Sequence, residues 1–265
     1  SNTTSMSPTD IWTLSDRYIK PQRSDQLSFG VYGNFGRKAV ETSAEAYYKK
    51  LKNILDYKGG ATLLMNEHLE TDVISGNGKA YGVELMVKKQ YGSFTGWISY
   101  TYSRIFLKVD GPYSVEKVNS GEYFPADFDK PHDLKIVTNS KLSRRFNLTT
   151  NFVYNTGRPI TYPVAFYGFN NANRVYYSNR NEYRIPDYIR LDLAATVNGN
   201  LKAKKLNHSS FTFTVYNVLG RKNPYSIFFR TEDGEIKGYQ MTIFSQPIFM
   251  ASYSFRIRGN ATGDF

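Results

Sequence analysis

A two-residue alternation of apolar and polar side chains runs along most of this 265-residue chain. Between Ser93 and Ser103 the even positions are mostly apolar or aromatic, and the odd positions are mostly Ser and Thr. Successive side chains of a β-strand point to opposite faces of the sheet, whereas a helix would scatter this pattern around its circumference. The same alternation recurs in 146–155, 188–197 and 249–257. The sequence therefore predicts an all-β fold.

The alternation predicts about nine strands, joined by connections of two kinds. Short turns are expected at 36–38, 91–93 and 143–145, with a moderate turn at 200–208. Long loops are expected at 57–78, 111–131 and 161–183, with a shorter loop at 230–236. Because short and long connections alternate strictly, we expect all short turns at one end of the sheet and all long loops at the other. The predicted strands are 24–35, 38–56, 79–91, 93–110, 132–142, 146–160, 184–199, 209–229 and 237–257.

Three features favour an antiparallel transmembrane β-barrel over the alternative, a soluble β-sandwich that buries its apolar face. Several predicted strands have about 13 to 20 residues, against ~5–6 in globular sheets, and tilted strands that cross a ~25 Å apolar band need such lengths. Aromatic residues gather toward strand ends, as they do at membrane interfaces. Charges occupy the polar faces, where a dry core would disfavour them. The residues predicted to face the lumen are Glu41, Glu45, Glu84, Lys88, Arg190 and Asp192.

Composition excludes several other classes of protein. No stretch reaches ~18 uninterrupted apolar residues, which excludes membrane-spanning helices. The chain has no Cys and only three His, which leaves little for a metalloenzyme, and the common hydrolase and protease motifs are missing, so we predict neither an enzyme nor a cofactor. The net charge of +11 is spread over separate hairpin ends, which suits strand ends near anionic lipid headgroups better than a nucleic-acid partner.

Six segments carry motifs that are weak singly but moderately specific together. They are Gly76–Glu84, Gly96–Arg104, Phe128–Leu134, Tyr154–Pro159, Arg180–Asp192 and Tyr216–Asn223. In combination they resemble the barrel of TonB-dependent outer-membrane receptors of the Bacteroidota type, and the resemblance covers nearly the whole chain. It implies a location in the cell outer membrane and a barrel of about 22 strands around a plug.

The resemblance also implies that residues 1–265 supply about nine C-terminal strands, without a plug domain or a TonB box, and that 258–265 extend past the last strand. An odd number of strands does not close a regular antiparallel barrel. We therefore expect a fragment of a larger receptor or one chain of a split receptor. The expected partners are the N-terminal barrel strands and plug, the TonB system, lipopolysaccharide and phospholipid, the outer-membrane assembly machinery and a surface lipoprotein.

The family's C-terminus is periplasmic, so the resemblance places the short turns in the periplasm and the long loops outside, where ligands bind. Aromatic side chains and Arg in these loops can stack on flat ligands or sugars and grip carboxylates or phosphates. The alternative is a loop that packs on itself at the lipopolysaccharide level, with Arg pairing lipid phosphates. The candidate ligand-binding residues are Tyr113, Tyr123, Phe124, Tyr162, Tyr167, Phe169, Tyr176, Tyr177, Arg180 and Arg184.

Two charged clusters invite other interpretations. The carboxylates of Asp127, Asp129 and Asp133, with His132, could hold Ca²⁺, but turn formation explains them as well, and no metal is predicted. Arg190 and Asp192 lie two residues apart on one strand face. We expect them in a cross-strand ion-pair network with Glu84 or Lys135.

The leading functional hypothesis is uptake of a nutrient ligand, with this chain forming barrel wall and part of the extracellular ligand-facing loops. One alternative is a porin-like or structural barrel subunit of a surface complex without active transport. Another is a soluble all-β binding module. Siderophore, cobalamin, glycan and peptide receptors share this barrel, and their loops decide among these ligands.

Overall fold

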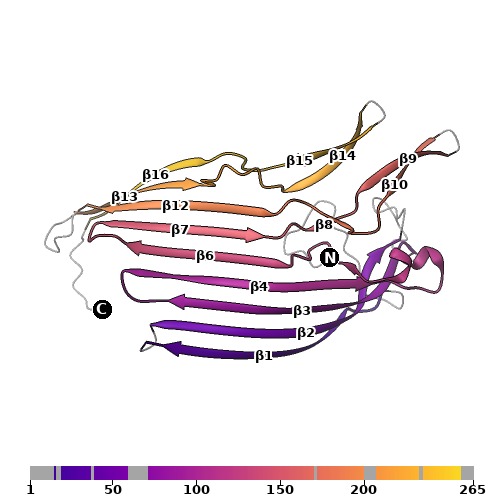
Figure 1. The fold of residues 1–265 in the computed structure, drawn as a ribbon, viewed down its shortest axis with the longest axis horizontal. Helices are drawn as coiled ribbons and strands as arrows, with labels where there is room; N and C mark the ends of the chain where they lie inside the picture. The colour runs from indigo at the N-terminus through magenta and orange to yellow at the C-terminus, as the bar shows by residue number, and fades with distance from the viewer. Residues whose placement is uncertain are drawn as a thin grey trace.

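The computed structural model describes residues 15, 19–36, 39–58, 71–169, 172–199, 207–232 and 235–257. Nine long strands form one curved antiparallel sheet, with β1 and β16 at its edges (Figure 1). Neighbours in the sheet follow one another along the chain, apart from short strands in the loops. The nine strands are β1 (Arg23–Phe35), β2 (Val40–Tyr57), β3 (Val73–Lys89), β4 (Phe94–Lys108), β6 (His132–Lys141), β7 (Phe146–Asn155), β12 (Tyr188–Asn198), β13 (Asn207–Tyr216) and β16 (Ile248–Ile257). The predicted all-β antiparallel fold is confirmed.

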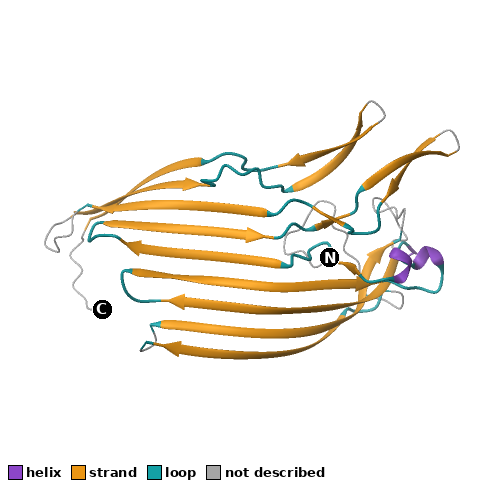
Figure 2. Ribbon diagram, viewed as in Figure 1, coloured by secondary structure: helices purple, strands orange, loops and turns teal. Residues whose placement is uncertain are grey.

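The two kinds of connection lie at opposite ends of the sheet, as predicted (Figure 2). The turns between β3 and β4 and between β6 and β7 lie at what we call the turn end, and the long connections lie at the loop end. The hairpins β9–β10 and β14–β15 project from the loop end (Figure 1). The loop-end elements are η2 (Ser114–Glu116), η3 (Asn119–Gly121), β5 (Phe124–Pro125), β8 (Pro159–Ile160), β9 (Pro163–Phe169), β10 (Ala172–Tyr177), β11 (Tyr183–Arg184), β14 (Ser226–Glu232) and β15 (Glu235–Met241). No helix among the residues that the structure describes is long and apolar enough to span a membrane.

Several predicted strand limits are wrong. The strand expected at 209–229 ends at Tyr216, because Asn217 and Gly220 adopt left-handed backbone with φ of 54° and 59°. The following residues form the separate β14–β15 hairpin, which also divides the strand expected at 237–257. The strand expected at 146–160 stops at Asn155, and β3 begins at Val73 rather than at position 79.

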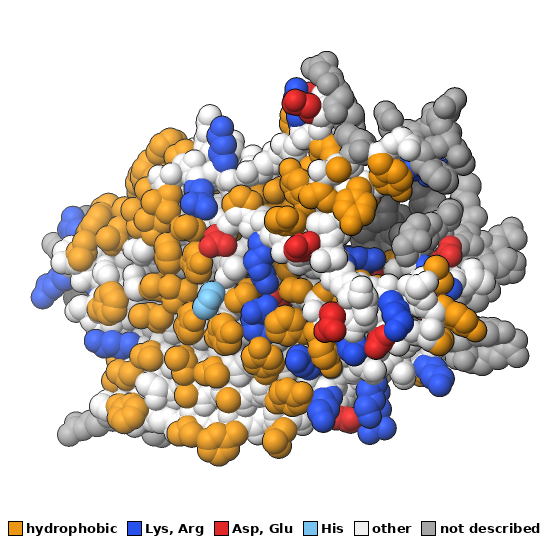
Figure 3. Space-filling model, turned by 45° about the vertical axis from the view of Figure 1, so that its right-hand side comes forward, with side chains coloured by type: hydrophobic (Ala, Val, Ile, Leu, Met, Phe, Trp, Pro, Cys, Tyr) orange, Lys and Arg blue, Asp and Glu red, His pale blue; other side chains and the backbone are white. Residues whose placement is uncertain are grey.

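One face of the sheet, which we call the apolar face, carries continuous rows of hydrophobic side chains. The register places Val87 opposite Ile98, Ile98 opposite Ile136, Ile136 opposite Phe152, and Phe152 opposite Leu191. Figure 3 shows this face, with hydrophobic side chains spread over the strands toward the left of the view. These rows do not close on one another as a sealed core, because their side chains remain exposed (Val87 and Ile98 are each 47% exposed).

The opposite face, which we call the polar face, carries the charged residues of the strands. The register runs from Glu41 to Lys88, then across Trp97 and Val137 to Asn151 and Asp192. Lys88 Nζ lies 3.4 Å from Glu41 Oε2. All six residues predicted to face the lumen share this face: Glu41, Glu45, Glu84, Lys88, Arg190 and Asp192.

A compact hydrophobic core is found at the loop end of β3 and β4. It consists of Ile74, Val109, Val118 and Phe124, with Leu107 packed against it. Val109 is fully buried and Phe124 is only 2% exposed. This core fixes the 111–131 loop to the sheet, and it thereby holds the loop-end polar groups in defined positions.

Candidate functional site

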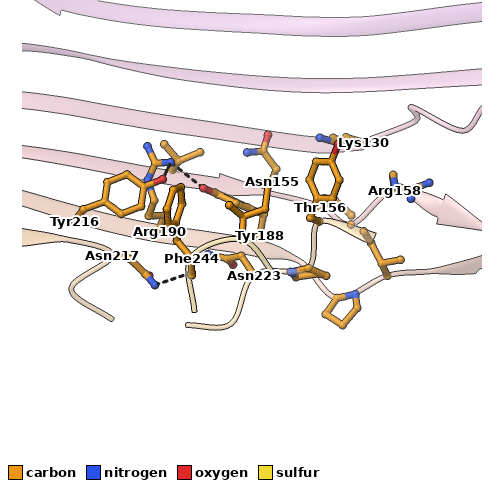
Figure 4. A pocket seen from close by; sticks show the side chains of 17 residues that line it. Lys130, Asn155, Thr156, Arg158, Tyr188, Arg190, Tyr216, Asn217, Asn223 and Phe244 are labelled. Carbon is orange, nitrogen blue, oxygen red and sulfur yellow. Dashed lines mark hydrogen bonds between the residues drawn. The ribbon is translucent and has the colours of Figure 1, made fainter. Parts of the chain in front are cut away.

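A pocket of about 610 Å³ lies on the polar face at the loop end, where β7, β12 and β13 end (Figure 4). The charged residues in its lining are all cations: Lys130, Arg158 and Arg190. Aromatic rings and amides complete the wall. They include Tyr188, Tyr216, Tyr225, Phe244, Asn155, Asn217 and Asn223. The pocket therefore suits an anionic group on a ligand that also offers a flat or apolar surface.

The guanidinium of Arg190 is held in place on the pocket wall by two tyrosines. Its Nη1 donates hydrogen bonds to the hydroxyl oxygens of Tyr188 at 2.9 Å and Tyr216 at 2.6 Å (Figure 4). Its carbon Cζ also lies 4.5 Å from the centroid of the Tyr216 ring, within cation–π distance. Both rings come from polar-face positions on neighbouring strands, so the sheet itself sets this geometry.

Asp192 binds the other side of Arg190 and accepts hydrogen bonds from three donors among the described residues. Arg190 Nε donates to Oδ2 at 3.1 Å and Asn151 Nδ2 donates to the same oxygen at 3.0 Å. The backbone N–H of Asn217 donates to Oδ1 at 2.9 Å. The carboxylate is 13% exposed, and these bonds replace much of the hydration that it loses.

The predicted cross-strand network of this pair with Glu84 or Lys135 is wrong. Lys135 Nζ pairs with Asp133 Oδ1 at 3.1 Å on its own strand. In the register, Val153 of β7 stands between Lys135 and Arg190. Neighbouring strands lie ~4.8 Å apart, so the backbones that carry the two cations are ~9.6 Å apart, and each cation pairs with an aspartate of its own strand. Glu84 lies on β3, further still across the sheet.

Asn217 closes the pocket where β13 leaves the sheet. Its side chain is 1% exposed, and its Nδ2 donates to the carbonyl oxygens of Arg221 at 3.1 Å and Phe244 at 3.4 Å. Its Oδ1 has no partner among the described residues. A buried amide oxygen without a donor is costly, so a water or ligand donor that reaches it would be favourable.

Asp129 joins two loops beside the pocket. Its side chain is fully buried, and its Oδ1 accepts the backbone N–H of Ile105 at 2.8 Å. Arg104 Nε lies 3.3 Å from Oδ2, and the guanidinium of Arg184 forms a close ion pair with the same oxygen. Arg184 Nη1 also donates to the carbonyl oxygens of Asp129 at 2.7 Å and Gly157 at 2.9 Å. Arg184, a predicted ligand contact, thus fixes the 123–131 loop to the pocket rim.

Arg180, the other predicted arginine contact, also binds within the protein. Its Nη1 lies 2.7 Å from Asp56 Oδ1 at the end of β2. Asn119 brackets its backbone, accepting its N–H at 2.7 Å and donating to its carbonyl at 3.0 Å. The two arginines therefore support the loops, and ligand contact through them stays a prediction.

The aromatic candidates in the 111–131 loop point in different directions. Tyr113 is 68% exposed beside η2. The Tyr123 ring lies 4.2 Å from Lys79 Nζ, on the apolar-face side of β3. Phe124 is buried in the loop-end core, which leaves it no surface for a ligand.

The aromatic candidates of the 161–183 loop are divided between packing and exposure. Tyr162 packs edge-on against Phe229 of β14, with ring centroids 4.9 Å apart, and this contact joins the two projecting hairpins. The exposed rings on β9–β10 are Tyr167, Tyr176 and Tyr177. Phe169 ends β9, and its side chain lies outside the described residues.

The acidic cluster proposed as a weak Ca²⁺ candidate does not converge. Asp129 is neutralised by two arginines, and Asp127 Oδ1 accepts Asn181 Nδ2 at 2.6 Å. On the apolar face the His132 ring stacks with Tyr100 and lies tilted against Tyr102, while Asp133 faces the polar side. In the described part of the chain, no three His, Cys, Asp or Glu side chains gather closely enough to hold a metal ion.

Of the residues that line the pocket, sequence reasoning named only Arg190 as a site residue, and the residues that it missed include Lys130, Arg158 and Tyr216. The alternation could have indicated Tyr216, because it occupies a polar-face position at the loop end of β13. Lys130 and Arg158 lie in loops and have no periodic signal.

Two ion pairs of Asp110 stabilise the turn after β4. Asp110 Oδ1 lies 2.9 Å from Lys117 Nζ, and Oδ2 lies 3.4 Å from Lys108 Nζ. Hydrogen bonds from Lys117 and then Lys108 hold the pKa of the Asp110 carboxyl below its usual value.

Comparison with known proteins agrees with this architecture. The model of the family "TonB dependent receptor-like, beta-barrel" matches residues 2–218. The chain belongs to this family. No curated protein sequence matches it. Two solved receptors share its fold: the ferripyoverdine receptor of the outer membrane of Pseudomonas aeruginosa, bound to ferripyoverdine, and the ferric-catecholate import receptor Fiu from E. coli K12 in its closed form.

The likeness to these receptors extends over most of this chain and a minority of theirs. The first is 13% identical with a TM-score of 0.55, and the match covers 90% of this chain and 27% of the receptor. The second is 12% identical with a TM-score of 0.58, and it covers 96% and 31%. At such identities the likeness shows the fold alone. The chain spans about a third or less of their length, and its sheet of nine long strands matches part of each receptor.

Proposed function

We propose that this chain is the C-terminal wall section of an outer-membrane TonB-dependent receptor, of Bacteroidota type, that takes up a nutrient ligand. The observation that carries the proposal is the division of the sheet into an exposed apolar face and a polar face with charges on neighbouring strands. Hydrocarbon is the environment that stabilises such an apolar face, and a wet or plugged lumen suits the polar face. The family match supports a complete receptor with a plug and TonB coupling.

The pocket supplies a role for the loop end within this proposal. Its lining offers three cations and several aromatic rings, and it opens on the polar face among the long loops. Ligands enter such a receptor at the loop end when those loops lie outside the cell. We therefore assign the pocket to an anionic group of the ligand, with Lys130 and Arg158 as the cations that no carboxylate pairs with among the described residues.

The absence of cysteine makes the topology directly testable. Single cysteines would be introduced at Leu85 on the apolar face, at Met86 on the polar face and at Tyr176 on the β9–β10 hairpin. We expect an impermeant maleimide to label the Tyr176 site in intact cells, and a quencher attached to lipid chains to quench a fluorophore at Leu85 but not at Met86. Equal quenching at Leu85 and Met86 would contradict the membrane orientation.

Uptake is tested with radiolabelled ferric catecholate, ferric hydroxamate and cobalamin in cells with and without a functional TonB. We expect uptake of one class to require TonB, and Lys130→Gln with Arg158→Gln to weaken binding of an anionic ligand by about tenfold or more. Lys141→Gln, at the turn end of β6, is the control and should bind normally. Uptake that is independent of TonB would favour the porin-like alternative instead.

A further inference from the structure

A group of five cations, which we call the basic patch, lies on the apolar face at the loop end of β2, β3 and β4. The register places Lys50 opposite Lys79, and Lys52 opposite Asn77, which in turn faces Lys108. Arg104 occupies the same face opposite Tyr81. The patch is Lys50, Lys52, Lys79, Arg104 and Lys108. Figure 3 shows Lys and Arg side chains gathered at the lower right of this face, beside the hydrophobic area.

Three of these lysines keep their charge available. Lys50 and Lys52 are exposed, and no carboxylate in the described part of the chain pairs with Lys50, Lys52 or Lys79. Asp25 stands opposite Lys50 in the register, but it pairs with Arg23 at 3.2 Å.

Lys79 rests against an aromatic ring, and among the described residues only the two remaining patch members pair with carboxylates. Lys79 Nζ rests 4.2 Å above the Tyr123 ring, a contact that orients the ammonium and leaves its charge unneutralised. Arg104 pairs with Asp129 and Lys108 pairs with Asp110. The unpaired charge of the patch is therefore concentrated on β2 and β3.

The order of side chains along the strands matches the depth profile of a bilayer. On β2, Lys50 is followed toward the turn end by Tyr48 and then by Ala46 and Ala44. On β3, Lys79 is followed by Tyr81 and then by the aliphatic Val83, Leu85 and Val87. Each step of two residues moves ~6.6 Å along the strand. Cation, aromatic ring and aliphatic chain thus follow one another as headgroup, interface and hydrocarbon do.

The patch is confined to one section of the sheet. At the loop ends of β6, β7 and β12, the apolar-face positions carry His132, Tyr154 and Ile189 rather than Lys or Arg. The loop arginines that sequence reasoning offered to lipid phosphates, Arg180 and Arg184, instead bind Asp56 and Asp129. On the apolar face of the described sheet, the unpaired cations that could meet membrane phosphates are therefore concentrated on β2 and β3.

We propose that the basic patch binds the phosphate groups of lipid headgroups in the leaflet at the loop end. This inference rests on the proposed membrane-spanning role, because it takes the apolar rows as the lipid boundary. Lysine ammonium groups beside an anionic membrane surface contribute about fivefold in affinity each, so the three unpaired lysines together contribute on the order of 100-fold. Glycolipid phosphates anchored by their chains would meet the ammonium groups while their acyl chains cover the aliphatic rows below.

The test uses the complete receptor that contains this chain, inserted into phosphatidylcholine nanodiscs that hold a minor fraction of bisphosphorylated lipid A. The variant is Lys50→Gln/Lys52→Gln/Lys79→Gln. The control, Lys49→Gln/Lys89→Gln/Lys141→Gln, removes the same charge from the polar face and from the turn end. Native mass spectrometry measures the retained lipid A, and gel mobility before and after heating verifies the folded barrel.

We expect the patch variant to lose lipid A binding by on the order of 100-fold and the control to change by less than about threefold. Dephosphorylated lipid A should bind wild type as weakly as lipid A binds the patch variant. The proposed phosphate binding would be overturned if the patch variant and the control lost the same amount of lipid A binding. It would also be overturned if dephosphorylated lipid A bound wild type as tightly as lipid A does. Failure of wild type to insert into nanodiscs would instead overturn the membrane-spanning role, which makes the two failures distinguishable.

Discussion

Replacing Asp129 by Asn tests whether the loop end depends on one buried carboxylate. The substitution keeps an oxygen that can accept the Ile105 N–H at 2.8 Å, but it removes the charge that pairs with Arg104 and Arg184. Breaking a fully buried ion pair costs about 3–5 kcal/mol. The two arginine side chains are 24% and 28% exposed, so water recovers part of their solvation. We expect a loss of about 2–3 kcal/mol in the free energy of unfolding.

The control for this substitution is Asp133→Asn, two positions after the end of the same loop. Asp133 pairs with Lys135 at 3.1 Å, but the two side chains are 29% and 45% exposed. An ion pair that is open to water contributes about 0–1 kcal/mol, so this variant should remain close to wild type. Both changes remove one carboxylate charge, and only the first removes a buried one.

The assay is equilibrium urea unfolding of the protein refolded in detergent micelles, combined with hydrogen exchange of the Ile105 amide. We expect Asp129→Asn to lower the midpoint at an unchanged slope and to speed exchange at this amide. A double-mutant cycle with Arg184→Gln should give a coupling energy of about 1–3 kcal/mol. If Asp129→Asn costs no more than Asp133→Asn, the buried carboxylate does not hold the loops together and the reasoning is refuted.

Three further predictions concern other parts of the chain. Leu85→Arg, on the apolar face, should destabilise the folded protein in lipid vesicles by about 2–4 kcal/mol, whereas Met86→Arg on the polar face should cost much less; equal costs in urea titrations would contradict the assignment of faces. Gly157→Ala should distort the pocket rim, because the new Cβ would lie 1.7 Å from the Ile185 carbonyl oxygen; a crystal structure with an unchanged pocket would refute this. The lowered pKa of Asp110 means that its ion pairs stabilise the 110–117 turn above the unfolded pKa of about 3.8 and are lost as pH falls below it, so the protection of the turn amides, taken relative to their intrinsic exchange rate at each pH, should fall below about pH 4 in wild type and stay constant in Asp110→Asn.

The strand faces could be read from the sequence because alternation is a local property of a strand. The face of a residue in the apolar rows, such as Val87 or Phe152, can be predicted because residues two positions away lie on the same face and are also apolar. The segregation of turns and loops followed equally directly, because antiparallel neighbours reverse direction at every connection. The sequence therefore determined the fold class, the two faces of the sheet and the ends at which the short turns and the long loops lie.

The loop end depends on partners that are far apart in the chain. Arg184 meets Asp129 across 55 positions and Arg180 meets Asp56 across 124, and neither pairing leaves a periodic trace. Phe124 looks like an exposed loop aromatic in sequence, yet it is buried because it packs in one cluster with Ile74, Val109 and Val118.

The sequence by itself determined which face of each strand is apolar, because every second residue of a strand points to the same face. Only the tertiary structure decided which cations at the loop end of the sheet remain unpaired, because that depends on which carboxylates the fold brings beside them. Among the described residues, no carboxylate pairs with Lys50 or Lys52 at the apolar face, whereas Asp129 neutralises the charge of Arg184.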